Sequence, residues 1–188
     1  MGTPFRLIVV AASSGGLEAF ERIVGRFAPD FHGAIAAVID TGDEDPGRLI
    51  DNLKRHTALQ VGIAQEGEPL SHGRIVLPPP GSDLVVRANR RLGLEANAAG
   101  ASAVADRLFA SAARAFGRQV IGVVLTGAGA DGSAGLVEVK KHGGRCVVQS
   151  PSDAKVPGMP ISAIVHDSPD HIVLLDDIAP LLIDLIAA

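Results

Sequence analysis

Apolar positions follow two spacings along this chain. Some form near-continuous runs, which are typical of strands buried on both faces; these runs cover about residues 5–11, 34–40, 119–125 and 145–149. Between the runs, apolar residues recur every three or four positions, which predicts amphipathic helices; the first set is Leu17, Phe20, Ile23, Val24 and Phe27. The alternation predicts a doubly wound α/β fold, with a mostly parallel sheet and helices on both faces. We expect the four runs to be parallel neighbours in that sheet.

The middle of the chain interrupts this alternation. From Leu59 to Leu94, short apolar runs are separated by turns, and the Pro78–Gly81 stretch is a firm break. Polar residues 89–91 between two apolar runs predict an antiparallel hairpin near an edge of the sheet. Helical spacing returns from Val104 to Phe116, and after the run at 119–125 a second helix is expected to stop at a Gly-Gly pair at 143–144. A last helix is expected from about Ile178. With no repeat or linker, we expect a single domain over residues 1–188.

Composition removes several classes of function. The 188 residues include 47% hydrophobic but only 3% aromatic residues, with no Trp and no Tyr, and the formal net charge is -4. Few rings to stack on bases and no basic excess argue against a nucleic-acid partner. The start of the chain has no signal-peptide build and its apolar stretch is too short to span a bilayer, which predicts a cytoplasmic protein without membrane insertion. The single cysteine, Cys146, lies in an apolar run and is expected to be a buried structural thiol.

Two loops follow predicted strands and carry candidate chemistry, because open parallel sheets bind ligands beyond the carboxyl ends of their strands. The first loop, Ala11–Gly16, resembles a nucleophile elbow with Ser13 in the serine position. The alternative is that Ser13 or Ser14 caps the following helix. The second loop runs from Leu125 to Gly132, where Asp131 either caps a helix or turn or orients a catalytic base.

Longer segments around these loops match a known family. They are 9–19 (VVAASSGGLEA), 123–127 (VVLTG) followed by Gly129, Asp131, Gly132 and Gly135, and 149–162 with Pro157-Gly158-Met159-Pro160 inside it. Segments 66–70 and 75–79 are similar to the family's hairpin region. The chain thus resembles, over nearly its whole length, the catalytic domain of bacterial chemotaxis protein-glutamate methylesterases. No receiver domain, which usually accompanies that domain in the family, is expected in this chain.

The resemblance implies hydrolysis of methylated glutamates on chemoreceptors by a Ser-His-Asp triad. Carried over by position, the nucleophile falls on Ser13 and the triad aspartate on Asp131. Oxyanion and loop positions would be Ser14, Gly15, Gly16, Gly127, Ala128 and Met159. The implied partner is a methylated chemoreceptor or another signalling protein, and no cofactor is implied.

The family histidine has no counterpart at the matching position. An ungapped reading places Asp40 there, at the end of the second predicted strand, and none of the six histidines lies at that strand end. Residues 98–102 and the alanines at 128 and 130 also stand where the family carries basic, proline, Met or Asn residues. Loss of a triad base costs on the order of 10⁴ to 10⁶ in turnover. We therefore expect a divergent member with weak or lost activity.

Three functions stay open on the sequence. They are a non-catalytic binding or regulatory pseudoenzyme, a serine hydrolase that uses a different base, and a small-molecule binding domain. The acidic run Asp40, Asp43, Glu44 and Asp45 lacks the glycine and distal glutamate of a calcium loop, so we interpret it as a solvated loop and expect no metal.

Overall fold

A computed structural model of the chain describes residues 5–42, 46–97 and 103–188. The strands are β1 (Arg6–Ala12), β2 (Gly33–Ile39), β3 (Gln60–Ile63), β4 (Arg74–Leu77), β5 (Ser82–Val86), β6 (Leu92–Ala96), β7 (Val120–Val124), β8 (Arg145–Gln149) and β9 (His171–Val173). The helices are α1 (Gly16–Val24), α2 (Pro46–His56), α3 (Val104–Phe116), α4 (Ser133–Lys141), α5 (Gly158–His166) and α6 (Leu175–Ala187), with a 3₁₀ turn, η1, at Gly117–Gln119. The last helix begins three residues before the predicted start.

The main sheet confirms the predicted parallel core. Its seven strands within the described residues run in the order β3-β4-β2-β1-β7-β8-β9, and every pairing is parallel. The four long apolar runs form β2, β1, β7 and β8, which are adjacent. Since the strands are parallel, all loops that leave their carboxyl ends meet at one edge of the sheet.

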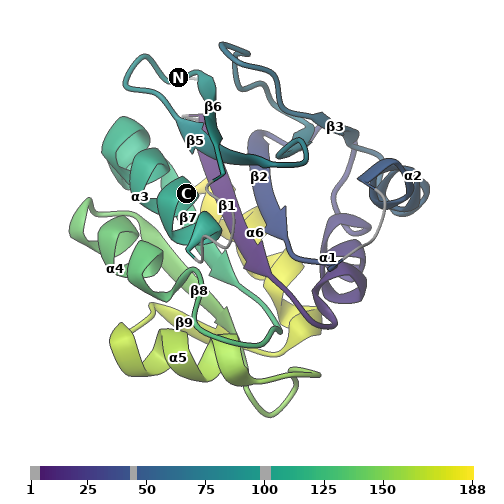
Figure 1. Cartoon of the computed structure of the whole chain (residues 1–188). Helices are drawn as coiled ribbons and strands as arrows, with labels where there is room; N and C mark the ends of the chain where they lie inside the picture. The colour runs from purple at the N-terminus through teal and green to yellow at the C-terminus, as the bar shows by residue number, and fades with distance from the viewer. Residues whose placement is uncertain (1–4, 43–45, 98–102) are drawn as a thin grey trace.

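Helices cover both faces of this sheet, as a doubly wound fold requires (Figure 1). Alternate residues of β1, such as Ile8 and Val10, pack with α1, α2 and α6. The intervening residues, such as Leu7 and Val9, pack with α3, α4, α5 and the β5–β6 hairpin. This two-sided burial explains the near-continuous apolar runs, because neither face of the strand meets water.

The hairpin confirms one prediction and corrects another. Strands β5 and β6 pair antiparallel around the predicted turn, but they form a separate two-stranded sheet rather than an edge of the main one. Ser111 of α3 holds the hairpin by accepting the Val86 N–H at 3.0 Å, and Asp83 forms an ion pair with Arg107 of α3. The hairpin lies beside α3 in the layer that covers one face of the main sheet (Figure 1), and its buried side chains, including Leu84 and Leu92, pack there.

Two short runs in the middle of the chain belong to the main sheet. Residues 60–63 and 74–77 form β3 and β4, which extend the parallel order beyond β2. Interpreting 75–79 as part of a hairpin region was therefore wrong for β4. Four-residue strands carry too little alternation to distinguish parallel from antiparallel pairing.

Two other predictions concern the cysteine and two segments of the chain. Cys146 is fully buried, its Sγ donates to the Leu136 carbonyl at 3.4 Å, and burial raises the pKa of the thiol, which confirms a structural cysteine. The interpretations of residues 43–45 and 98–102 lie outside the described residues. Among the described helices, none is long and apolar enough to cross a membrane.

Candidate functional site

The first candidate loop joins β1 to α1 by a tight turn. Gly15 has φ +76°, a left-handed conformation that favours glycine, and α1 begins at the next residue. The Ser13 N–H donates to the Thr126 carbonyl at 3.1 Å, and the Ser13 carbonyl accepts the Gly16 N–H at 2.6 Å. No side chain caps α1. The capping alternative for Ser13 and Ser14 is therefore wrong, and both hydroxyls are left for other uses.

Three segments meet beside Ser13. Gly127, in the loop after β7, lies directly against Ser13. A Cβ added to Gly127 would lie 2.9 Å from both the Cβ and the backbone nitrogen of Ser13. The same position faces the sulfur of Met159, and the Gly127 carbonyl accepts the Met159 N–H at 2.9 Å. Only glycine fits between these two neighbours, so Ser13, Gly127 and Met159 form one contact cluster at the carboxyl edge.

Thr126 ties this cluster together, although sequence reasoning did not select it. Its buried hydroxyl accepts the Val156 N–H at 2.8 Å and donates to the Ser14 carbonyl at 3.0 Å, with the Val156 carbonyl at 3.2 Å as a second acceptor. Its own N–H donates to the Oε1 of buried Gln149 at 2.9 Å. The available signal was a polar residue immediately after the most apolar strand, where burial demands hydrogen-bond partners.

The predicted oxyanion positions divide into two groups. The N–H groups of Gly16, Gly127 and Met159 donate to the carbonyls of Ser13, Val156 and Gly127, so they hold the loops. Within the described part of the chain, the N–H groups of Ser14, Gly15 and Ala128 have no protein acceptor. These three are the backbone donors left to a developing negative charge.

Asp131 has a structural task in this molecule. Its two carboxylate oxygens accept the backbone N–H groups of Ala105 and Asp106, each at 3.0 Å, in the first turn of α3. The residue before that helix, Ala103, has φ +76° and supplies no cap from its side chain. Asp131 therefore caps α3 from a distant loop, rather than the helix α4 that follows it in sequence.

Asp106, in α3, caps the helix α4. Its Oδ1 accepts the Gly135 N–H at 2.6 Å, and Asp131, from the loop before α4, caps α3. Burial raises the pKa of Asp106, backbone N–H groups lower it, and the nearby negative charge of Asp131 raises it further. The pair fixes the loop that carries Asp131 against the start of α3.

Asp40 lies just past the end of β2, at the same edge of the sheet. Its N–H donates to the Ala12 carbonyl at 2.9 Å, and its exposed carboxylate accepts the Gly42 N–H at 3.0 Å in a local turn. Asp40 and Asp131 line a common cavity of about 620 Å³ with Val38, Val104 and Ala128. Asp40 and Asp131 therefore open onto one cavity, whereas Ser13 is not among the residues that line it.

Five of the six histidines lie toward the opposite edge of the sheet. Each of the five falls just before the start of a strand, after helices or loops that return to the amino edge: His32, His56, His72, His142 and His166. His171 lies midway along the sheet, because its partner in β8, Val147, is level with Val10 of β1. A seven-residue strand such as β1 spans about 20 Å between the two edges. This length separates the first five histidines from Ser13, and His171 lies three strands from β1, about 14 Å away across the sheet.

Comparison with known proteins places the chain in a family. A family model described as CheB methylesterase matches residues 8–182, so the chain belongs to the CheB methylesterase family. Protein-glutamate methylesterase FrzG of Myxococcus xanthus is 34% identical over 181 residues, which are 95% of this chain and 54% of that protein. A putative protein-glutamate methylesterase/protein-glutamine glutaminase of Leptospira interrogans is 32% identical over 185 residues, covering 96% of this chain and 95% of that relative.

A solved structure shares the fold. The CheB methylesterase catalytic domain of Thermotoga maritima superposes with a TM-score of 0.87 at 25% identity, covering 97% of this chain and 99% of that one. The α/β architecture, the separate antiparallel pair included, is thus that of a CheB catalytic domain. The chain spans about half the length of several curated relatives and nearly all of the Leptospira protein.

Proposed function

We propose that this chain is a methylesterase-family domain that keeps the nucleophile position at Ser13 but has weak or no esterase turnover, because Asp40 stands where the base is needed. In this proposal it serves as a binding or regulatory module toward a methylated chemoreceptor or another signalling protein. The observation that carries the proposal is the separation of the groups: Ser13, Asp40 and Asp131 lie at the carboxyl edge, where none of the six histidines lies.

The chemistry of the two side chains supports loss of turnover. In water, histidine titrates near pH 6.5 and aspartate near pH 3.9, so the exchange replaces a good general base at neutral pH with a weak one. A triad also needs the base to become cationic between the nucleophile and the aspartate. Asp40 instead adds a second carboxylate to the cavity that Asp131 lines, and two nearby negative charges oppose each other.

The surviving loop geometry supports retained binding. The turn at Ser13 is fixed by Thr126 and Gly127, and free backbone donors remain at Ser14, Gly15 and Ala128. Such donors can hold an ester or carboxylate oxygen without any proton transfer. A domain of this kind would bind an esterified or free glutamate side chain and leave it unchanged.

The test restores the missing base. Asp40→His is assayed for methanol release from a peptide that contains a glutamate methyl ester, beside the native chain and the double variant Asp40→His with Ser13→Ala. The proposal expects Asp40→His to raise turnover about tenfold to a hundredfold, well below full recovery, because poor positioning still costs about 10². The double variant should return to the native level.

The matched control is Asp30→His, which makes the same exchange on an exposed loop before β2 at the amino edge. It should leave turnover unchanged. An equal rise in Asp30→His would show a non-specific effect of added imidazole, and no rise in Asp40→His would show that the missing base is not the limiting defect. If the native chain already turns over through Ser13, loss of activity in Asp40→Asn would identify a hydrolase that uses Asp40 as its base.

A further inference from the structure

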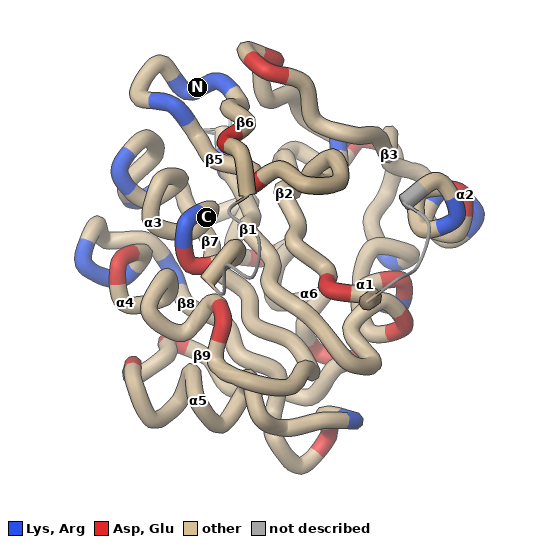
Figure 2. The backbone as a smooth tube through the Cα atoms, viewed as in Figure 1, with Lys and Arg blue, Asp and Glu red and all other residues tan. Residues whose placement is uncertain are grey.

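Positive charge is concentrated in one part of this acidic protein. Residues 82–118 and 133–145 contain nine Lys and Arg but only four Asp and Glu, a net charge of +5, while the remainder of the chain carries -9. Two of those four acids, Asp83 and Asp106, are buried or partly buried. Figure 2 shows the blue segments gathered on the β5–β6 hairpin and on the ends of α3 and α4.

Six cations form one surface, which we call the basic ridge. Its members are all exposed: Arg90, Arg114, Arg118, Lys140, Lys141 and Arg145. Three of them pair with acids, Lys140 with Asp167, Lys141 with Glu138 and Arg145 with Asp170. At the hairpin tip, the Arg90 Nε donates to the Ala115 carbonyl at 3.1 Å, and its guanidinium lies 5.0 Å from the centre of the Phe116 ring. The Arg118 side chain packs on Gly143, next to the start of β8. The ridge therefore runs from the hairpin across the end of α3 to the turn after α4.

Helix ends account for only part of the ridge. Lys and Arg are favoured in the last turn of a helix by the helix dipole, which explains Arg114, Lys140 and Lys141. Arg90 belongs to no helix, and its φ of +63° is a left-handed conformation that costs a non-glycine residue about 1 kcal/mol or more. An arginine is thus held at a strained position where glycine or asparagine would fit better, with its charge over a ring.

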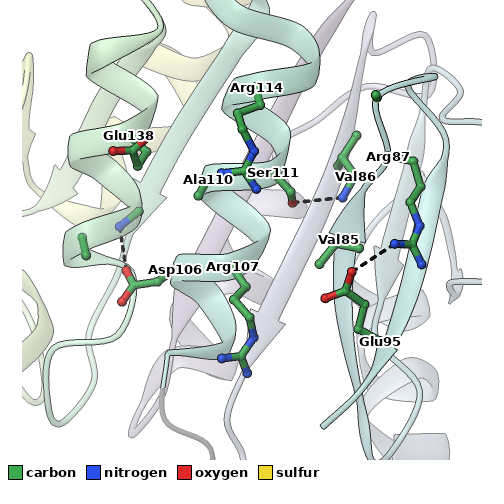
Figure 3. Close-up of a pocket in the computed structure, with 13 residues that line it drawn as sticks. Val85, Val86, Arg87, Glu95, Asp106, Arg107, Ala110, Ser111, Arg114 and Glu138 are labelled. Carbon is green, nitrogen blue, oxygen red and sulfur yellow. Dashed lines mark hydrogen bonds and ion pairs between the residues drawn. The ribbon is translucent and has the colours of Figure 1, made fainter.

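A groove continues from the ridge. A hollow of about 530 Å³ lies between the hairpin and the helices α3 and α4 (Figure 3). Its lining includes Arg87, Arg107 and Arg114, and also Glu95, Asp106 and Glu138. Arg114 belongs to both the groove and the ridge. Arg87 already forms an ion pair in this groove, because its guanidinium donates to Glu95 at 3.0 Å. The groove therefore carries as many acids as arginines, and the excess of positive charge lies on the ridge.

We propose that the basic ridge docks an acidic, Asp/Glu-rich segment of a partner protein. Nucleic acid fits less well, because the chain has no Trp or Tyr and Phe116 is buried beneath Arg90. A membrane fits less well, because the exposed large apolar side chains lie on α5, β9 and α6 rather than on the ridge segments. The rest of the chain, with its net charge of -9, would repel an extended polyanion. A short acidic segment would lie within one Debye length, about 8 Å, of the ridge alone.

This proposal goes beyond the function proposed for the Ser13 region. The ridge lies at the ends of α3 and α4 that return to the amino edge of the sheet, whereas Ser13 lies at the carboxyl edge. Docking at the ridge needs neither turnover nor the Ser13 loop. Its test therefore fails or succeeds independently of the esterase assay.

The experiment measures binding of a fluorescent peptide of alternating glutamate and serine by anisotropy, with a glutamine–serine peptide as the uncharged control. We expect the native chain to bind the acidic peptide alone, and affinity to fall as salt rises from about 50 to about 300 mM. Arg118→Glu with Lys141→Glu should weaken binding about tenfold or more, whereas Arg118→Lys should bind like the native chain. The matched control is Lys54→Glu with Arg55→Glu on α2, which changes the net charge equally and should have little effect.

Four results would overturn the proposal. They are no binding of the acidic peptide, equal loss in the α2 control, tighter binding of a single-stranded oligonucleotide or of anionic vesicles than of the peptide, and self-association of the native chain that the ridge variant abolishes. The last would make a second copy of this chain the occupant of the ridge. Circular dichroism of each variant establishes that a lost signal reflects the surface and not the fold.

Discussion

The two halves of the candidate site are built differently. Around Ser13, three loops are interlocked by buried groups, with the Thr126 hydroxyl and Gly127 at their centre. At the end of β2, Asp40 is exposed, and among the described residues its carboxylate accepts one local hydrogen bond, from the Gly42 N–H. The first half is part of the fold, whereas the second is a side chain on its surface.

This difference explains how a domain can keep its framework and lack a catalytic base. Exchanging an exposed side chain at a strand end costs the fold little, usually within about 0.5 kcal/mol. Exchanging Thr126 or Asp131 removes hydrogen bonds that join separate segments. The site can therefore lose its chemistry at Asp40 while the nucleophile loop stays in place for structural reasons.

The largest effect on stability is expected at Thr126. Thr126→Val removes the acceptor of the Val156 N–H and the donor to the Ser14 carbonyl, which should lower the free energy of unfolding by about 2 kcal/mol. Thr126→Ser keeps the hydroxyl and should lose much less, and Asp40→Ala should lose under about 0.5 kcal/mol. Urea unfolding measures all three. Equal losses in Thr126→Val and Asp40→Ala would break the contrast between the two halves.

A middle-sized effect is expected at Asp131. Asp131→Ala leaves two N–H groups of the first turn of α3 without their acceptor, which should cost about 1–2 kcal/mol. Ser13→Ala should leave stability nearly unchanged, because no side chain among the described residues caps α1. Thermal unfolding of the two variants makes the comparison. Native-like stability of Asp131→Ala would mean that α3 is capped without it.

The smallest effect is a pH dependence at Asp106. Burial raises the pKa of this carboxyl, so the folded state binds its proton more tightly than the unfolded state does. The contribution of Asp106 to stability should therefore be greatest in acid and decline as pH rises through the window just above the ordinary value of 3.8. The difference in unfolding free energy between the native chain and Asp106→Asn should grow by less than about 0.5 kcal/mol as pH falls from about 6 to about 4. A difference that shrinks toward acid would contradict the assigned shift.

Much of the fold could be predicted from the sequence because burial on both faces leaves long apolar runs. Strands β1, β2, β7 and β8 were predicted as neighbours, and they are. The hairpin was predicted at an edge of the main sheet because a local sequence pattern indicates that two strands pair, but not where the pair packs in the fold. Strands β3 and β4 were missed as members of the sheet because four residues are too few to show their direction.

The candidate site could be predicted only where loop chemistry is local. The turn at Ser13 and the approach of Gly127 follow from glycines beside strand ends. The exchange of caps between Asp131 and Asp106 joins residues 25 positions apart in sequence, and no spacing rule marks it. Thr126 was overlooked because its role depends on backbone groups of two other loops, which only the folded chain brings within reach.

The central claim is that the Ser13 framework lacks a working base. The most direct measurement is methanol release from a methyl-esterified chemoreceptor fragment by the native chain, compared with Ser13→Ala under the same conditions. The account predicts that the two rates are indistinguishable, since without a base near Ser13 its hydroxyl adds little to turnover. Release by the native chain that Ser13→Ala abolishes would contradict the account and establish an active serine esterase.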